Sequence, residues 1–236
     1  SYQSAGEGYL DAEVGLERLP LSMANGFIPD RLLRLRGYAE GNLTVQGSLS
    51  KPDINGEVLF DSAYIFSEPY GIVMRCADDP LPITGSHLVF ENYDLFANNA
   101  SPLTIQGYLD FSNTDDMQLK LRMRADNYLL IDAKETARSE AYGKAFVNFY
   151  GLMQGAVSNL SMRGRLDVLG TTDLRYNLKD SPLSTDNQLE GLVEFVNLQD
   201  TAEDVINRPP LTGFNMDLNV NIDDGAHVDC YLNADH

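Results

Sequence analysis

Hydrophobic and polar residues alternate along most of this chain, and one alternating pattern returns at nearly even intervals. Residues 43–49 read Leu-Thr-Val-Gln-Gly-Ser-Leu, and similar heptads occupy residues 103–109 and 160–166. A looser copy lies at residues 33–39. In each full copy leucine, a second aliphatic residue and glycine fall at alternate positions, which places them on one face of an extended strand. The pattern therefore predicts strands that have one apolar face and one polar face.

Segments with turn chemistry predict how these strands are joined. Glu40–Gly41 is expected to be the turn of a hairpin, residues 92–94 a second turn, and Asp224–Gly225 the turn of a hairpin near the end of the chain. Residues 19–29 are predicted to be an irregular or helical connection, and the charged residues 132–140 a loop or a short helix. The strands between these segments should form a β-meander.

Composition divides the chain into three regions. Residues 1–180 carry the repeated strands and are predicted to form one β-sheet segment, whereas residues 181–212 are acidic and polar, as expected of a flexible connection with at most a short helix. Residues 213–236 return to alternation and are predicted to be a truncated hairpin that continues the sheet. The chain starts without Met and without a signal-like segment, and we expect it to be an excerpt of a longer polypeptide.

A meander with one apolar face must cover that face. It can fold over on itself, pack against a second sheet, or hold an apolar ligand. The repeated glycines, Gly47, Gly107 and Gly164, lie on the apolar face, where a closed sandwich favours branched side chains. Either they permit a bend or bulge of the sheet in each repeat, or they leave a continuous hollow along a curved sheet.

The strong negative charge of the chain argues against a nucleic-acid partner. Acidic residues outnumber basic ones by 35 to 17, for a net charge of −18, whereas nucleic-acid binding depends on neutralising phosphates with Lys and Arg. Several arginines nevertheless form pairs on the polar side of predicted strands. We interpret them as a solvated outer face that discourages aggregation, or as contacts at the rim of a groove for lipid headgroups or an acidic partner. They are Arg34, Arg36, Arg122, Arg124, Arg163 and Arg165.

No catalytic or metal-binding constellation competes with the repeated strands. The chain has three His and two widely separated Cys, so a transition-metal site is not predicted. Carboxylate pairs such as residues 115–116 lie in turn-forming clusters, and neither a phosphate-binding glycine loop nor a nucleophile elbow is present. We therefore expect no enzyme activity and no cofactor. Cys76 and Cys230 are interpreted as small strand residues, with a disulfide between them as the alternative.

Several segments resemble a known family. Residues 41–56 resemble the glycine, leucine and proline pattern of the AsmA-like superfamily. Residues 60–64, 109–112, 146–151 and 166–172 are similar to the TamB family, the translocation and assembly module subunits of Bacteroidetes-type bacteria. The order and spacing of these motifs carry the resemblance, which extends across nearly the whole chain.

The resemblance implies a large envelope protein that is anchored in the inner membrane and crosses the periplasm. In this family a long β-sheet is folded lengthwise into a hydrophobic groove, a β-taco. Such proteins are implicated in moving phospholipid toward the outer membrane, and in assembling outer-membrane proteins with a BamA-like barrel partner. The sequence departs from the family pattern in lacking the membrane anchor and the final C-terminal segment.

We therefore expect an all-β, repetitive antiparallel sheet folded lengthwise into an open hydrophobic groove, with one short helical or loop insertion. Its predicted function is to carry phospholipid or another acyl-chain ligand as a periplasmic, nonenzymatic segment. One alternative is a scaffold that captures a client strand at a sheet edge, and another is a carbohydrate-binding sandwich with exposed aromatics such as Tyr108. The residues predicted to line the groove are Val45, Gly47, Leu49, Ile105, Gly107, Leu109, Phe111, Leu119, Leu121, Met123, Met162, Gly164, Leu166 and Val168.

Overall fold

The prediction of an all-β protein is confirmed. The structure, a computed structural model, describes residues 8–27, 33–137, 139, 141–177 and 214–231, so the acidic connection predicted at 181–212 lies outside the described residues. The described part of the chain forms a 13-stranded sheet with one short 3₁₀ helix. The elements are β1 (Tyr9–Pro20), η1 (Leu21–Phe27), β2 (Arg34–Ser48), β3 (Pro52–Ser67), β4 (Ile72–Cys76), β5 (Leu81–Thr84), β6 (His87–Phe96), β7 (Pro102–Asp110), β8 (Gln118–Ala133), β9 (Ala141–Ala156), β10 (Asn159–Val168), β11 (Asp173–Asn177), β12 (Phe214–Ile222) and β13 (His227–Tyr231).

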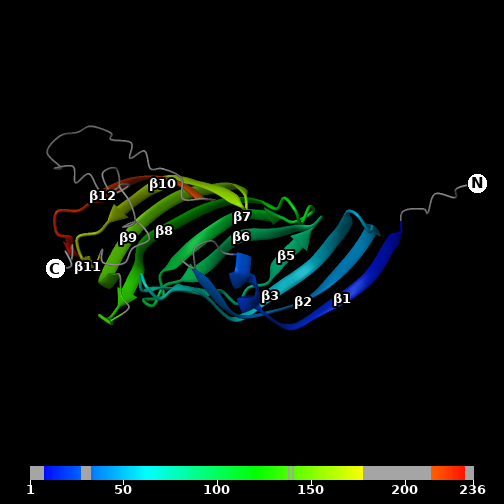
Figure 1. Ribbon diagram of the computed structural model, residues 1–236, viewed down its shortest axis with the longest axis horizontal. Helices are drawn as coiled ribbons and strands as arrows, with labels where there is room; N and C mark the ends of the chain where they lie inside the picture. The colour runs from blue at the N-terminus through cyan, green and yellow to red at the C-terminus, as the bar shows by residue number, and fades with distance from the viewer. Residues whose placement is uncertain (1–7, 28–32, 138, 140, 178–213, 232–236) are drawn as a thin grey trace, which may run out of the picture.

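The sheet is a long meander in which most strands pair with the strand that precedes them (Figure 1). Its order is β1-β2-β3-β4-β6-β7-β8-β9-β10-β12. Strand β5 pairs with β3 and β6, as β4 does, and β11 pairs with β9, as β10 does. Together, β4 and β5 occupy one strand position beside β3, and β10 and β11 occupy one strand position beside β9. The helical connection predicted before the second strand is η1, and no described helix has the length and apolar composition needed to cross a membrane.

The hairpin predicted around Asp224–Gly225 is wrong. Strand β12 runs parallel to β10, with Leu160 opposite Phe214, and β13 runs parallel to β11. Residues 223–226 form a loop between β12 and β13 that lies against the loop between β10 and β11. The backbone N–H of Asp223 donates to the Val168 carbonyl at 2.9 Å, which ties the two loops together. The Asp224–Gly225 pair thus lies in a loop between two strands that run in the same direction, and the chain does not reverse there.

Two other predicted turns lie inside continuous strands. Glu40 and Gly41 are in the middle of β2, which pairs along its length with β1 and β3. An ideal Cβ on Gly41 would collide with the carbonyl oxygen of Glu57 in β3. Glycine is therefore needed here because β2 and β3 approach each other closely. Asn92 lies within β6, where its φ of 48° belongs to a β-bulge between Phe90 and Tyr93.

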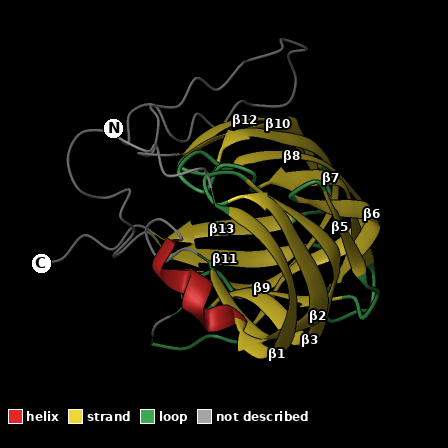
Figure 2. Cartoon of the chain, turned by 90° about the vertical axis from the view of Figure 1, so that its right-hand side faces the viewer, coloured by secondary structure: helices red, strands yellow, loops and turns green. Residues whose placement is uncertain are grey.

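Bulges bend the sheet across its strands. Strands β1, β3, β6 and β8 each contain a register shift that includes a non-glycine residue with positive φ, and β8 has a second shift, between Leu129 and Ile131, without one. Such bulges increase the local twist and bend the strand. The sheet accordingly curls (Figure 2). The residues at the bulges are Arg18, Ser62, Asn92 and Asn127.

The core lies on the inner face of the curl. Its main cluster joins residues from β3 through β9, including Tyr93 and Tyr128, and residues of β10 pack against it. A smaller cluster of Ala39, Val58 and Ile83 lies toward β1 and β2, and Leu21 of η1 packs against both clusters. Cys76 is a free thiol in the main cluster, so the structure does not support the alternative disulfide, and burial raises its pKa to about 11.

One end of the curl is drawn together by the turn between β3 and β4. The N–H of Asp132 donates to the Gly71 carbonyl at 3.1 Å, and the N–H of Ala141 donates to the Pro69 carbonyl at 3.1 Å. These bonds connect the β3–β4 turn to the end of β8 and the start of β9. Strand β7 begins at Pro102 and pairs with β8 only as far as Ala125, so the remainder of β8 is free to contact β4.

Candidate functional site

The inner face carries a row of apolar residues that crosses the sheet from the outer strand β1 to β10. Directly opposed residues on successive strands share a face of the sheet. Followed through the register, one such row contains only aliphatic residues and glycine. Its members, from β1 to β10, are Val14, Leu43, Gly56, Ile83, Leu88, Leu109, Leu119, Gly155 and Leu160.

Exposure of the inner face rises from its centre to its two outer strands. Ile83 in the centre is 6% exposed, whereas Val14 on β1 is 40% exposed. On the opposite side, Val220 and Ile222 of β12 are 40% and 37% exposed, although they stand opposite the apolar Leu166 and Val168 of β10. The face is therefore a closed core at its middle and an accessible apolar surface toward its edges.

The structure places nearly all the predicted lining residues on this inner face, but at different depths. Ile105 and Met123 are each 7% exposed and belong to the core rather than to an accessible surface. Phe111 follows β7 and packs against the smaller core cluster. The half-buried members are Val45, Leu109, Leu119, Leu121, Met162, Leu166 and Val168.

Leu49 does not lie where it was predicted. Strand β2 ends at Ser48, and Leu49 stands in the following bend with 63% of its surface exposed. Its N–H donates to the Gly8 carbonyl at 3.1 Å. The strand is one residue shorter than the alternation predicts, because a leucine at the end of a repeat does not indicate where strand pairing stops.

The repeated glycines lie on the inner face, and the backbone accounts for all three without a hollow. Gly107 has a φ of 142°, and an ideal Cβ there would collide with the carbonyl oxygen of Lys120. A Cβ on Gly164 would collide in the same way with the carbonyl oxygen of Tyr150. At Gly47 the nearest atoms are 3.7 Å away, but its φ of 99° lies in a region that side chains disfavour. Of the two readings left open by the sequence, close strand approach at a bend accounts for Gly107 and Gly164.

The arginine pairs lie on the outer face and not at the rim of a groove. Arg122 and Arg124 on β8, and Arg163 and Arg165 on β10, alternate with inward-facing residues in the middle of their strands. Their positions exclude contact with the inner face, because side chains at alternate positions point to opposite faces. The prediction of a rim is therefore wrong for these four residues, while contact with an acidic partner is untouched by this finding.

The third pair has a different environment. Arg36 on β2 stacks over the rings of Tyr64 and Phe66, at 4.3 Å and 5.7 Å from their centroids. Arg75 on β4 lies 4.7 Å from the centroid of Phe96 in the same manner. Arg34 is exposed near the start of β2. Arg36 therefore contributes to packing of the outer face through cation–π contacts.

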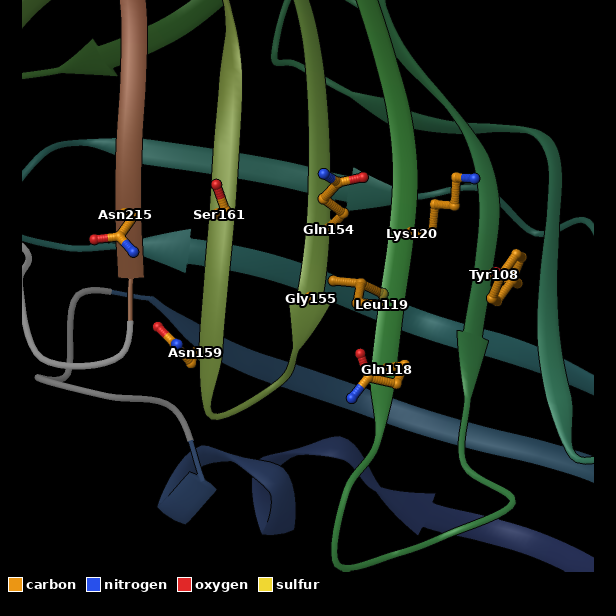
Figure 3. A pocket seen from close by; sticks show the side chains of 9 residues that line it. All are labelled: Tyr108, Gln118, Leu119, Lys120, Gln154, Gly155, Asn159, Ser161 and Asn215. Carbon is orange, nitrogen blue, oxygen red and sulfur yellow. The ribbon is translucent and has the colours of Figure 1, made fainter.

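A polar depression of about 430 Å³ lies on the outer face at one end of β7 to β12 (Figure 3). Opposed residues of five neighbouring strands form its central row, which the sequence analysis did not identify because it depends on register. That row is Tyr108, Lys120, Gln154, Ser161 and Asn215. Tyr108 is 37% exposed and meets the ring of His87 edge-on at 5.2 Å.

A hydrogen-bonded carboxylate lies on the same outer face, further along β10 than Ser161. Asp167 on β10 accepts hydrogen bonds from Asn221 at 2.8 Å and from Arg165 at 2.9 Å. The Asn221 hydrogen bond, and then Arg165, hold the pKa of Asp167 below its ordinary value. The described residues contain no group of three or more His, Cys, Asp or Glu able to hold a metal ion.

The inner apolar face and the outer polar face are thus the two candidate sites of the molecule. The first offers apolar surface without directed hydrogen-bonding groups, and the second offers cations, amides and hydroxyls. Comparison with known proteins assigns neither, because no family model, no curated protein and no solved structure matches the sequence.

Proposed function

We propose that the inner face binds the acyl chain of a lipid. We further propose that the protein is a periplasmic segment of a TamB-like envelope protein that carries phospholipid between the inner and outer membranes. The observation that carries the proposal is the uninterrupted apolar row from β1 to β10. Strands are about 4.8 Å apart, so such a row extends over roughly 40 Å along the sheet. This direction, across the strands, is the one a groove through a longer sheet would follow.

The exposed apolar residues on the outer strands of the inner face support the proposal energetically. Val14 and Val220, on the two outer strands, each keep 40% of their surface accessible. Each methylene of an acyl chain that covers such a surface gains about 0.8 kcal/mol, so contact with ten carbons offers on the order of 8 kcal/mol before ordering costs. A surface with no directed polar groups would accept acyl chains without distinguishing among headgroups.

A second candidate function rests on the edges of the sheet. Among the described residues β1 pairs only with β2, and β12 only with β10. An edge strand with unpaired backbone groups can add a strand from another chain. This feature favours a scaffold that captures client strands during outer-membrane protein assembly with a BamA-like barrel partner.

Lipid extraction with two matched variants tests the proposal. Val220 and Asn219 are neighbours on β12 that face inward and outward, respectively, because their partners on β10 are Leu166 and Arg165. Val220→Arg should place a charge on the apolar face, whereas Asn219→Arg adds the same charge outside. Ile105 is a poorer choice, since Arg at a site that is 7% exposed would disrupt the core. The purified proteins are extracted with organic solvent and the lipids measured by mass spectrometry.

We expect phospholipid in the wild type and in Asn219→Arg, and a severalfold lower amount in Val220→Arg. Circular dichroism of all three proteins checks that the sheet is retained. Equal lipid in both variants, or none in a folded wild type, would count against binding at the inner face. Crosslinks from client peptides to β1 or β12 in a lipid-free protein would favour the scaffold instead.

A further inference from the structure

Five cations gather on the outer face of β8 and β10, in a chain whose net charge is −18. They are Lys120, Arg122, Arg124, Arg163 and Arg165, and all five are exposed. Three carboxylates, Asp126, Asp167 and Asp217, are their neighbours along or across the strands. The cations outnumber these carboxylates, so this surface is locally positive on an acidic protein.

The arginines flank two exposed apolar side chains of β9. Leu152 lies between Arg122 and Arg163 in the cross-strand register, and Tyr150 lies between Arg124 and Arg165. Leu152 is 38% exposed and Tyr150 is 48% exposed. The two arginines of each row are separated by two strand spacings, roughly 10 Å at the backbone. We call these six residues the arginine strip.

The two rows of the arginine strip differ in how their charges are balanced. Arg124 lies 3.6 Å from Asp126, and Arg165 lies 2.9 Å from Asp167. Arg122 and Arg163 form no ion pair within the described residues, although Asp217 stands beside Arg163 on β12. Their guanidinium groups are therefore available to a carboxylate from outside the chain, which they can bind in bidentate geometry.

The polar depression continues the arginine strip by one further row. Lys120 and Gln154 of the depression lie two residues from Arg122 and Leu152 on the same strands and the same face. Gln154, Ser161 and Asn215 offer amide and hydroxyl groups there, and Tyr108 offers a ring at its margin (Figure 3). Cations, apolar surfaces and neutral hydrogen-bonding groups thus lie together on one continuous area.

We propose that this area is a binding site for an acidic polysaccharide. Carboxylates of such a polymer would bind Arg122 and Arg163, its sugar rings would lie on Leu152 and Tyr150, and its hydroxyls would bond to the groups of the depression. A membrane of anionic lipids would use the cations but not the row of amides and hydroxyls. The site is on the opposite face from the acyl-chain surface and does not depend on it.

The test measures binding of the whole chain to polygalacturonate by isothermal titration calorimetry at low salt. Arg122→Gln/Arg163→Gln removes two cations from the site, and Lys134→Gln/Lys144→Gln removes two exposed cations outside it. The first variant should weaken binding at least about tenfold, since two charge-assisted contacts are lost, and the second should leave affinity nearly unchanged. Tyr150→Ala, which alters no charge, should weaken binding about threefold or more.

Dextran serves as the neutral polymer, and vesicles of equal parts phosphatidylglycerol and phosphatidylcholine as the anionic membrane. Arg124→Gln/Arg165→Gln provides a second site variant if the first does not fold. The proposal is overturned if the wild type does not bind polygalacturonate, or if both cation variants lose affinity equally. It is also overturned if the vesicles bind more tightly than the polysaccharide through the same arginines, because a membrane surface would then be the partner.

Discussion

Replacing Gly107 by alanine should destabilise the sheet strongly, although glycine is usually a poor strand residue. Its φ of 142° lies in a region that side chains disfavour, and holding alanine there costs about 1–3 kcal/mol. A Cβ would also stand 2.9 Å from the carbonyl carbon of Lys120 and 3.0 Å from the Cα of Leu121. Relief requires β7 to move away from β8, which weakens ladder hydrogen bonds worth about 0.5–1.5 kcal/mol each. We therefore expect a loss of about 3 kcal/mol.

Urea unfolding followed by far-ultraviolet circular dichroism measures this loss, since the chain has no Trp to report by fluorescence. Gly26→Ala is the control, because a Cβ on Gly26 meets no atom within 4 Å and its φ is ordinary. That variant should be neutral or slightly stabilised, by at most about 1 kcal/mol. A Gly107→Ala protein as stable as the wild type, with an unchanged urea dependence, would refute the close approach of β7 and β8.

Two further predictions concern the loops and the outer face near β10. Thr172 is 2% exposed, and its hydroxyl accepts from the N–H of Phe146 at 3.0 Å and donates to its carbonyl at 3.2 Å. Thr172→Val should therefore lower the free energy of unfolding by about 1–3 kcal/mol, whereas the exposed Thr171→Val should change it little; equal urea midpoints would argue against this clamp. Because the pKa of Asp167 is lowered on folding, its stabilising contribution is present above the unfolded pKa and is lost as pH falls through the folded pKa. Asn221→Ala should raise the pKa of Asp167 in an NMR titration, and an unchanged pKa would contradict the hydrogen bond between β10 and β12.

The sequence was sufficient to predict which face of the sheet each strand residue occupies, but not how the strands are connected. Alternation correctly separated inward Leu121 from outward Arg122, because this property depends only on the chain itself. Gly41 and Asn92 were mistaken for turns, since the same residue types also serve close strand approach and bulges. Which of these occurs is decided by a partner strand that no local pattern identifies.

Predicting the outer polar depression would have required the register in which the strands pair. Tyr108 and Asn215 belong to one row only because four pairings between β7 and β12 align them. One of those pairings is parallel and joins segments more than 50 residues apart, which strand-by-strand reading could not anticipate. The arginines were found from sequence, but their placement on one area with Leu152 and Tyr150 was not.

The meander order has a consequence for how the protein acquires its structure. From β1 to β9 nearly every strand pairs with one that is close to it in the chain, so each interface forms with little loop-closure entropy. We expect the sheet to grow strand by strand from its N-terminal part, in the manner of a repeat protein with nearest-neighbour coupling. The parallel addition of β12 to β10 would come last, and amide hydrogens of β12 should exchange before those of β8.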